Sequence, residues 1–180
     1  MGLFILYFIL ALSVSALCSV LEAVFLSTPA TYVASVENEA GKNLRSAALL
    51  KSLKKQSNRP ISAILTINTI ANTMGAAGVG AQAGVAFGNQ WIGLFSGILT
   101  LCILVFSEII PKTIGNRYWR KLALPSANII RIMLFITYPL VMLAEVLTRF
   151  IGKGNSQSVS RDEVSAMVRV GADEGVFEKE

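Results

Sequence analysis

One glutamate follows one of the most apolar stretches of this chain. Residues 91–106 read WIGLFSGILTLCILVF without a charge, and SEIIPKTIG follows over residues 107–115. Glu108 therefore stands about one helical turn before a helix-breaking residue, Pro111. A buried carboxylate is costly in a bilayer unless it is paired, neutralised or bound to a cation. The compensating charge could come from Lys112, one turn further on, or from a bound cation, and both interpretations stay open.

Pro111 also affects the backbone. Proline lacks an N–H group, so the carbonyl of Ser107 loses its usual helical partner. Gly115 then permits either the close approach of another helix or a break. Transporters use broken helices with freed carbonyls to build ion sites near the middle of the membrane. We therefore expect an interrupted helix here, with Glu108 and freed carbonyl oxygens acting together as cation ligands.

Two carboxamides lie in another apolar run. Asn68 and Asn72 are four residues apart, so both project from one face of a helix. Facing lipid, they would leave several hydrogen-bonding groups unmet. They could bond neighbouring helices, or complete an all-oxygen site with Glu108 and a serine hydroxyl. Such a site suits hard cations such as magnesium, calcium or sodium, whereas zinc and copper prefer imidazole or thiolate.

The composition indicates an all-α integral membrane protein. Hydrophobic residues make up 53% of the chain and charged residues only 15%, against about 25% charged residues in typical soluble domains. The net charge is +5. The basic residues flank the apolar runs and are not interleaved with aromatic residues, so we expect no nucleic-acid partner. The chain has no histidine, and one glutamate without paired acids or an activated serine is a poor catalytic set, so we expect no enzyme.

Three apolar runs are expected to cross the membrane as helices, over about residues 2–28, 61–87 and 91–111. Between the first two, residues 31–58 are amphipathic and basic, which predicts a helical hairpin or a long bent helix on the cytosolic face of the membrane. The stretch 122–151 is too interrupted to cross, and we expect a kinked belt of juxtamembrane helices in the interface. The interrupting residues are Pro125, Arg131, Pro139 and Glu145.

The distribution of lysine and arginine predicts the orientation. Basic segments follow the first and third runs, while the loop 88–90 is uncharged. The positive-inside rule therefore places the N-terminus outside and the C-terminus in the cytosol of a multi-pass protein of the inner (plasma) membrane. Residues 1–151 form the transmembrane domain in this interpretation. Residues 152–180 form a linker and a cytosolic helix, supported by a capping box at Ser160 and Glu163, leading to a missing regulatory region.

Two pairs of glycines have the small-xxx-small spacing that lets helices approach closely. These pairs are Gly80 with Gly84 and Gly93 with Gly97. Packing within one subunit and a dimer interface are both open at this point.

Several segments together resemble the CorC/CNNM family of magnesium transporters. SEIIPKTIG resembles the family's G/S-E-hydrophobic-hydrophobic-P-K/Q motif, INTIANT at 67–73 its G-N-T-x-x-N stretch, and SVLEAVFLS at 19–27 its first-helix element. The tail from residue 163 is similar to the family's connection into a pair of CBS domains, which are absent here. Leu21 and Ile67 stand where the family usually has small or polar residues.

The resemblance implies a homodimer in the lipid bilayer, with three transmembrane helices, a juxtamembrane belt and cytosolic CBS domains in the full-length chain. It implies magnesium export, with sodium as the possible counter-ion and a dehydrated magnesium ion in the site. The family's cation ligands map onto Ser19, Asn68, Asn72, Glu108 and a backbone carbonyl near Gly115. The alternative is a membrane-embedded magnesium sensor that regulates cytosolic domains without transport.

Overall fold

The computed structural model describes residues 2–39 and 44–151, with backbone alone at 37–39, 145 and 147–151. The chain divides into two units, Met1–Ala144 and Glu145–Glu180, and all contacts given below lie within the first. Its elements are helical throughout the described residues, as the composition predicts.

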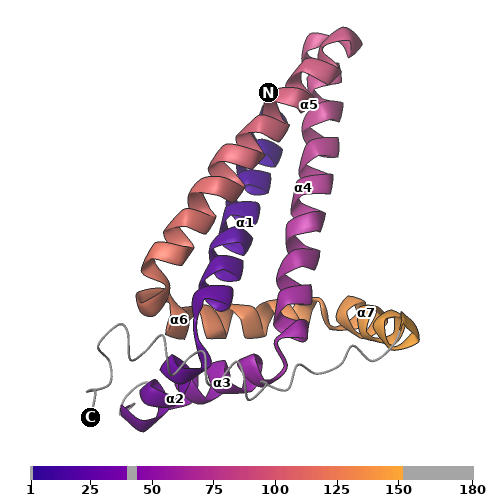
Figure 1. Cartoon of the computed structure of the whole chain (residues 1–180). Helices are drawn as coiled ribbons and strands as arrows, with labels where there is room; N and C mark the ends of the chain where they lie inside the picture. The colour runs from indigo at the N-terminus through magenta and orange to yellow at the C-terminus, as the bar shows by residue number, and fades with distance from the viewer. Residues whose placement is uncertain (1, 40–43, 152–180) are drawn as a thin grey trace. The chain divides into compact units, whose positions relative to one another are not determined.

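Three long helical stretches make up most of the first unit (Figure 1). The helix α1 spans Gly2–Ser27 and α4 spans Asn58–Phe87. The third stretch joins several elements end to end: the 3₁₀ turn η1 (Asn89–Trp91), α5 (Ile92–Cys102), the π-helix η2 (Ile103–Ile109) and the start of α6 (Ile110–Ile136). The helix α1 contacts both α4 and the third stretch.

The turn between α4 and the third stretch depends on a glycine. Gly88 has φ +96°, a backbone conformation that other residues rarely adopt. Its N–H donates to the carbonyl of Gly84 and so closes the end of α4. The short loop expected over residues 88–90 is present.

The third stretch continues past the expected boundary at residue 111. The helix α6 changes direction at Tyr118, which has non-helical φ −107° and ψ 18°. The helix therefore continues past Pro111, which stands in the first turn of α6 directly after η2. The end of the membrane span at about residue 111 stays a prediction.

Shorter helices gather at the C-terminal end of α1. The pair α2 (Ala30–Glu39) and α3 (Leu44–Lys55) occupies the segment predicted as a hairpin or a bent helix, and α3 contacts α6. The residues of the predicted belt form two helices, the second part of α6 and α7 (Tyr138–Ile151). The core of the unit lies where α1, α3, α4 and α6 meet, around Phe25, Leu50, Ile64 and Ile130.

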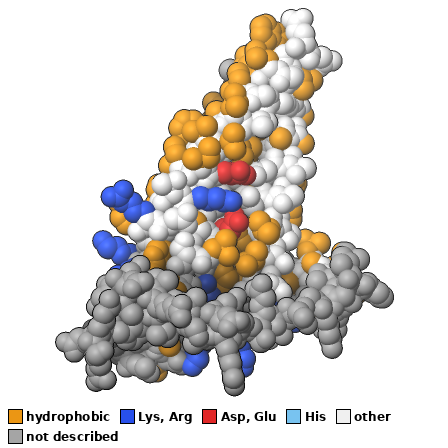
Figure 2. Space-filling model, viewed as in Figure 1, with side chains coloured by type: hydrophobic (Ala, Val, Ile, Leu, Met, Phe, Trp, Pro, Cys, Tyr) orange, Lys and Arg blue, Asp and Glu red, His pale blue; other side chains and the backbone are white. Residues whose placement is uncertain are grey.

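The surface of the long helices is apolar. Large side chains such as Leu10, Leu101 and Phe106 are exposed, and Figure 2 shows apolar groups along this face. Two stretches are long and apolar enough to cross a membrane, Gly2–Ser27 and Asn89–Ile136. This agrees with an all-α membrane protein. A crossing by α4 and the interfacial position of the belt stay predictions, and the linker and tail at 152–180 lie outside the described residues.

Candidate cation site

The predicted site residues come from α1, α4 and the third helical stretch. A few close contacts fix how these three helices are aligned along one another. The Ser107 hydroxyl donates to the carbonyl of Leu12 over 3.2 Å, and further along both helices Gly115 lies against Val20. The third stretch therefore runs parallel to α1. On the other side Gly75 lies against Ala11, while Asn68 bonds Ser15 further along α1, so α4 runs antiparallel.

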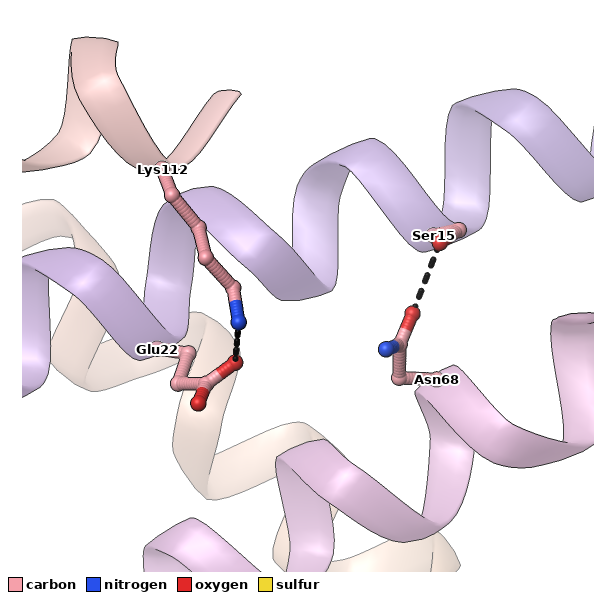
Figure 3. A network of polar contacts seen from close by, with 4 residues as sticks. All are labelled: Ser15, Glu22, Asn68 and Lys112. Carbon is pink, nitrogen blue, oxygen red and sulfur yellow. Dashed lines mark hydrogen bonds and ion pairs between the residues drawn. The ribbon is translucent and has the colours of Figure 1, made fainter. Parts of the chain in front are cut away.

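The carboxamide of Asn68 has a partner in the structure. The Ser15 hydroxyl donates to Asn68 Oδ1 over 2.8 Å (Figure 3). Ser15 itself is fully buried. The alternative role for the asparagines, a hydrogen bond between helices, thus applies to Asn68, and its carboxamide oxygen keeps a second lone pair.

Among the residues that the structure describes, two other side-chain oxygens are buried without a hydrogen-bond partner. These are Ser19 Oγ and Asn72 Oδ1. Native structures leave few buried polar atoms unpaired, and each such atom calls for an explanation such as a water or an ion. Asn72 lies on α4 between Asn68, which bonds Ser15, and Gly75, which touches Ala11. Its oxygen therefore belongs to the α1–α4 interface.

Glu108 lies in the π-helix η2, one residue after the anchored Ser107. Its side chain is partly buried, and within the part of the chain that the structure describes it has no ion-pair or hydrogen-bond partner. The helix is not broken at Pro111, so the expectation of an interruption is wrong. Instead the turns before Pro111 widen, and the N–H of Ile110 donates to the carbonyl of Val105, five residues back. Such π-turns are frequent at functional sites.

Gly115 serves a close approach between helices. A Cβ atom added to it would lie 2.8 Å from the carbonyl oxygen of Val20 and 2.8 Å from Cβ of Ala23. Of the two roles considered for this glycine, contact with another helix is the one observed. Its carbonyl as a cation ligand stays a prediction.

Lys112 pairs with Glu22, not with Glu108. Its Nζ lies 3.1 Å from Glu22 Oε2 (Figure 3). The Glu22 side chain is 16% exposed and that of Lys112 44%. Within the described residues, Lys112 thus forms its ion pair with Glu22 and none with Glu108. This ion pair also shows that Glu22 pairs with α6 and not with the basic segment after α1.

The predicted donors lie on neighbouring helices, and no hydrogen bond joins Glu108 to Ser19 or Asn72 within the described ranges of the chain. The donors are hydroxyl, carboxamide and carboxylate oxygens from three neighbouring elements, and two of them lack partners. Among the described residues no group of three or more His, Cys, Asp or Glu side chains is close enough to hold a metal.

Three contacts of the site were not foreseen from the sequence. They are the Ser15–Asn68 hydrogen bond, the anchoring of Ser107 to α1, and the Glu22–Lys112 ion pair. The spacing of Ser15 and Ser19, four residues apart, was a signal that both face the same neighbour.

The amino-acid sequence matches a known protein family and several individual relatives. The model of a family described as the cyclin M transmembrane N-terminal domain matches residues 5–180. The chain is 39% identical over 165 residues to the UPF0053 protein sll1254 of Synechocystis sp., covering 91% of this chain and 47% of that protein. It is 33% identical over 108 residues to the UPF0053 inner membrane protein YfjD of Escherichia coli. This match covers 59% of this chain and 25% of YfjD. A chloroplastic DUF21 domain-containing protein of Arabidopsis thaliana, At1g55930, is 26% identical over 73% of this chain and 21% of its own length. The chain thus spans less than half the length of these relatives.

Proposed function

The chain belongs to the family of the cyclin M (CNNM) transmembrane N-terminal domain, and on this premise we propose that it exports magnesium across the membrane, with sodium as the counter-ion. The observation that carries the proposal is the pair of buried, partnerless oxygens on α1 and α4, Ser19 Oγ and Asn72 Oδ1, with the carboxylate of Glu108 on the neighbouring η2. Buried polar atoms without partners are destabilising, and a cation would satisfy them.

The donor set supports magnesium or sodium as the cargo. In the proposal Ser19, Asn68, Asn72 and Glu108 hold a dehydrated ion together with a backbone carbonyl near Gly115. Hard cations take oxygen ligands of this kind. A weakly charged site also lets the ion leave, which a transporter requires.

A second function, magnesium sensing without transport, is favoured by the length of the relatives. The chain spans less than half of each, which leaves room for cytosolic regulatory domains such as a CBS pair. An ion site in the membrane could then report to those domains. Binding without flux in liposomes by a full-length protein would favour sensing.

We propose a homodimer with three spans in the inner (plasma) membrane, since one relative is named an inner membrane protein. The N-terminus would lie outside and the C-terminus in the cytosol. Labelling an Asn155→Cys variant tests this orientation. A maleimide that cannot cross membranes should reach residue 155 only in inverted vesicles. Labelling only from the outer side would reverse the orientation.

Magnesium flux into or out of proteoliposomes tests the transport function. Asn72→Ala and Glu108→Ala should each abolish it, because each removes a ligand oxygen. Thr113→Ala is the matched control, since this exposed hydroxyl donates only to Ile109 of its own helix. If both site variants moved magnesium like the parent protein, transport through this site would be excluded.

A further inference from the structure

The Glu22–Lys112 ion pair lies beside the candidate cation site on two helices at once. Glu22 follows Ser19 by three residues on α1, and Lys112 follows Glu108 by four residues in the third helical stretch. Because these two stretches run parallel, both members of the pair lie about one turn beyond a proposed ligand, in the same direction. Figure 2 shows one basic side chain between two acidic ones on this face.

The acids near the site are few. Glu22 and Glu108 are the only Asp or Glu residues whose side chains the structure describes. If Glu22 were free, two carboxylates would act on a cation near Ser19 and Glu108. In the structure Lys112 neutralises one of them at 3.1 Å. The region of the site therefore keeps one uncompensated negative charge, that of Glu108.

We propose that Lys112 is a charge-setting residue: by pairing with Glu22 it withholds the second carboxylate from the cation and keeps magnesium binding weak and reversible. Lys112 does not touch the ion in this arrangement and acts only through Glu22. The inference rests on the proposed function, because it concerns the affinity of the same site.

The proposal predicts opposite effects for the two members of the pair. Lys112→Met frees Glu22, so magnesium should bind at least about tenfold more tightly, because another full negative charge acts on a divalent ion in a medium of low dielectric. Glu22→Gln instead leaves the Lys112 ammonium unpaired beside Glu108, and binding should weaken several-fold. The double variant should bind close to the parent affinity.

A pair that serves only to hold the helices together would behave differently. Removing Lys112 would then leave the mostly buried carboxylate of Glu22 without its partner and destabilise the fold. Both single variants would lose magnesium binding. Tighter binding by Lys112→Met is therefore a result that a structural role does not produce. Lys121→Met is the control for net charge, since Lys121 is an exposed lysine of the same helix α6.

Isothermal titration of the 180-residue protein with magnesium alone, at constant ionic strength, compares the parent with Lys112→Met, Glu22→Gln, their double variant, the Lys121→Met control and Glu108→Gln. Parent-like or weaker binding by a folded Lys112→Met variant would overturn the inference. If Lys112→Met does not fold, the Glu22→Gln variant provides the test. A magnesium affinity of Glu22→Gln equal to that of the parent would then also overturn the inference. Absence of binding by the parent would instead refute the proposed function. If Glu108→Gln lost magnesium binding while Lys112→Met bound magnesium with the parent affinity, only the role of Lys112 would be refuted.

Discussion

Ser15 and Ser19 lie one helical turn apart on α1 and are both fully buried, yet only Ser15 makes a hydrogen bond. The Ser15 hydroxyl donates to Asn68 of α4, whereas Ser19 Oγ has no partner. The same residue type at the same depth of burial thus has two energetic roles. Ser15 stabilises the fold, and Ser19 is destabilising until something polar reaches it.

This contrast predicts opposite effects of two matched alanine substitutions. Without magnesium, Ser15→Ala should lower the free energy of unfolding by about 1–3 kcal/mol, because Asn68 Oδ1 loses its donor. Ser19→Ala should leave it unchanged or raise it, since no bond is lost. Thermal unfolding in detergent measures both.

Magnesium should reverse the order of the two serine variants. The parent and Ser15→Ala should gain stability on adding the ion, and Ser19→Ala should gain little because it lacks a ligand. If Ser19→Ala destabilised the ion-free protein as much as Ser15→Ala, an undetected partner of Ser19 would be indicated.

A second prediction concerns the contact between α1 and α6. Gly115→Ala would bring Cβ to 2.8 Å from Val20 O and Ala23 Cβ, so we expect a loss of about 1–3 kcal/mol from overpacking. Gly2→Ala on α1 is the control, because nothing lies within 4 Å of its added Cβ and it has no part in the proposed dimer contact. There the better helix propensity of alanine should be neutral or favourable. Equal stability of both variants would argue against the tight contact at Gly115.

Much of the helix plan could be predicted from apolar runs, because burying the backbone in lipid leaves few options other than helices. The chemical character of Asn68, Asn72 and Glu108 could also be recognised, since polar residues in such runs are costly. The partner of Lys112 could not be predicted. Lys112 stands one turn from Glu108 in the sequence, and only the parallel register of α1 and the third stretch brings it to Glu22.

The π-helix was missed for a different reason. Pro111 indicates that one helical hydrogen bond is lost, but it does not indicate how the chain adapts. A break and a widened turn both remove the bond. Here Ser107 is fixed to Leu12 O, and the chain stays helical up to Tyr118 with wider turns over Ile103–Ile109.

The proposed homodimer should depend on Gly93 and Gly97. Gly80 and Gly84 face Ser96 and Ile92 of α5 in the same chain, so packing within one subunit already uses them. No atom lies within 4 Å of a Cβ added at Gly93 or Gly97. The double substitution Gly93→Leu and Gly97→Leu should therefore lower the dimer fraction measured by light scattering in detergent while leaving thermal unfolding of the subunit cooperative. An unchanged dimer fraction would show that the interface lies on another face of the subunit.

Lys54 of α3 predicts a pH dependence of stability. Its Nζ donates to the carbonyl of Phe25 and lies 4.5 Å from the centre of the Phe25 ring. Burial lowers the pKa of Lys54 below its ordinary value of 10.5. Between the two pKa values the unfolded chain binds more protons, so this lysine makes stability rise with pH and the gain disappears as the pH falls through the lowered pKa.

Lys54→Gln removes that titration but keeps an N–H donor for Phe25. The difference in unfolding midpoint between the parent and Lys54→Gln should therefore shift in favour of the parent as the pH rises from below the lowered pKa of Lys54 towards its ordinary value of 10.5. A constant difference across this range would mean that the Lys54 ammonium is as well solvated in the folded protein as in the unfolded chain.

The last prediction is the strength of magnesium binding. With Glu22 paired to Lys112, Glu108 is the one ligand with a formal charge, and the remaining ligands are neutral oxygens. A dehydrated divalent ion would keep about one positive charge in a medium of low dielectric, which is unfavourable. Magnesium also gives up its waters reluctantly. We therefore expect an affinity no tighter than the micromolar range, lost in Glu108→Gln and weakened by competing sodium. Nanomolar binding by titration calorimetry, or binding indifferent to Glu108→Gln, would remove Glu108 as the charge-bearing ligand.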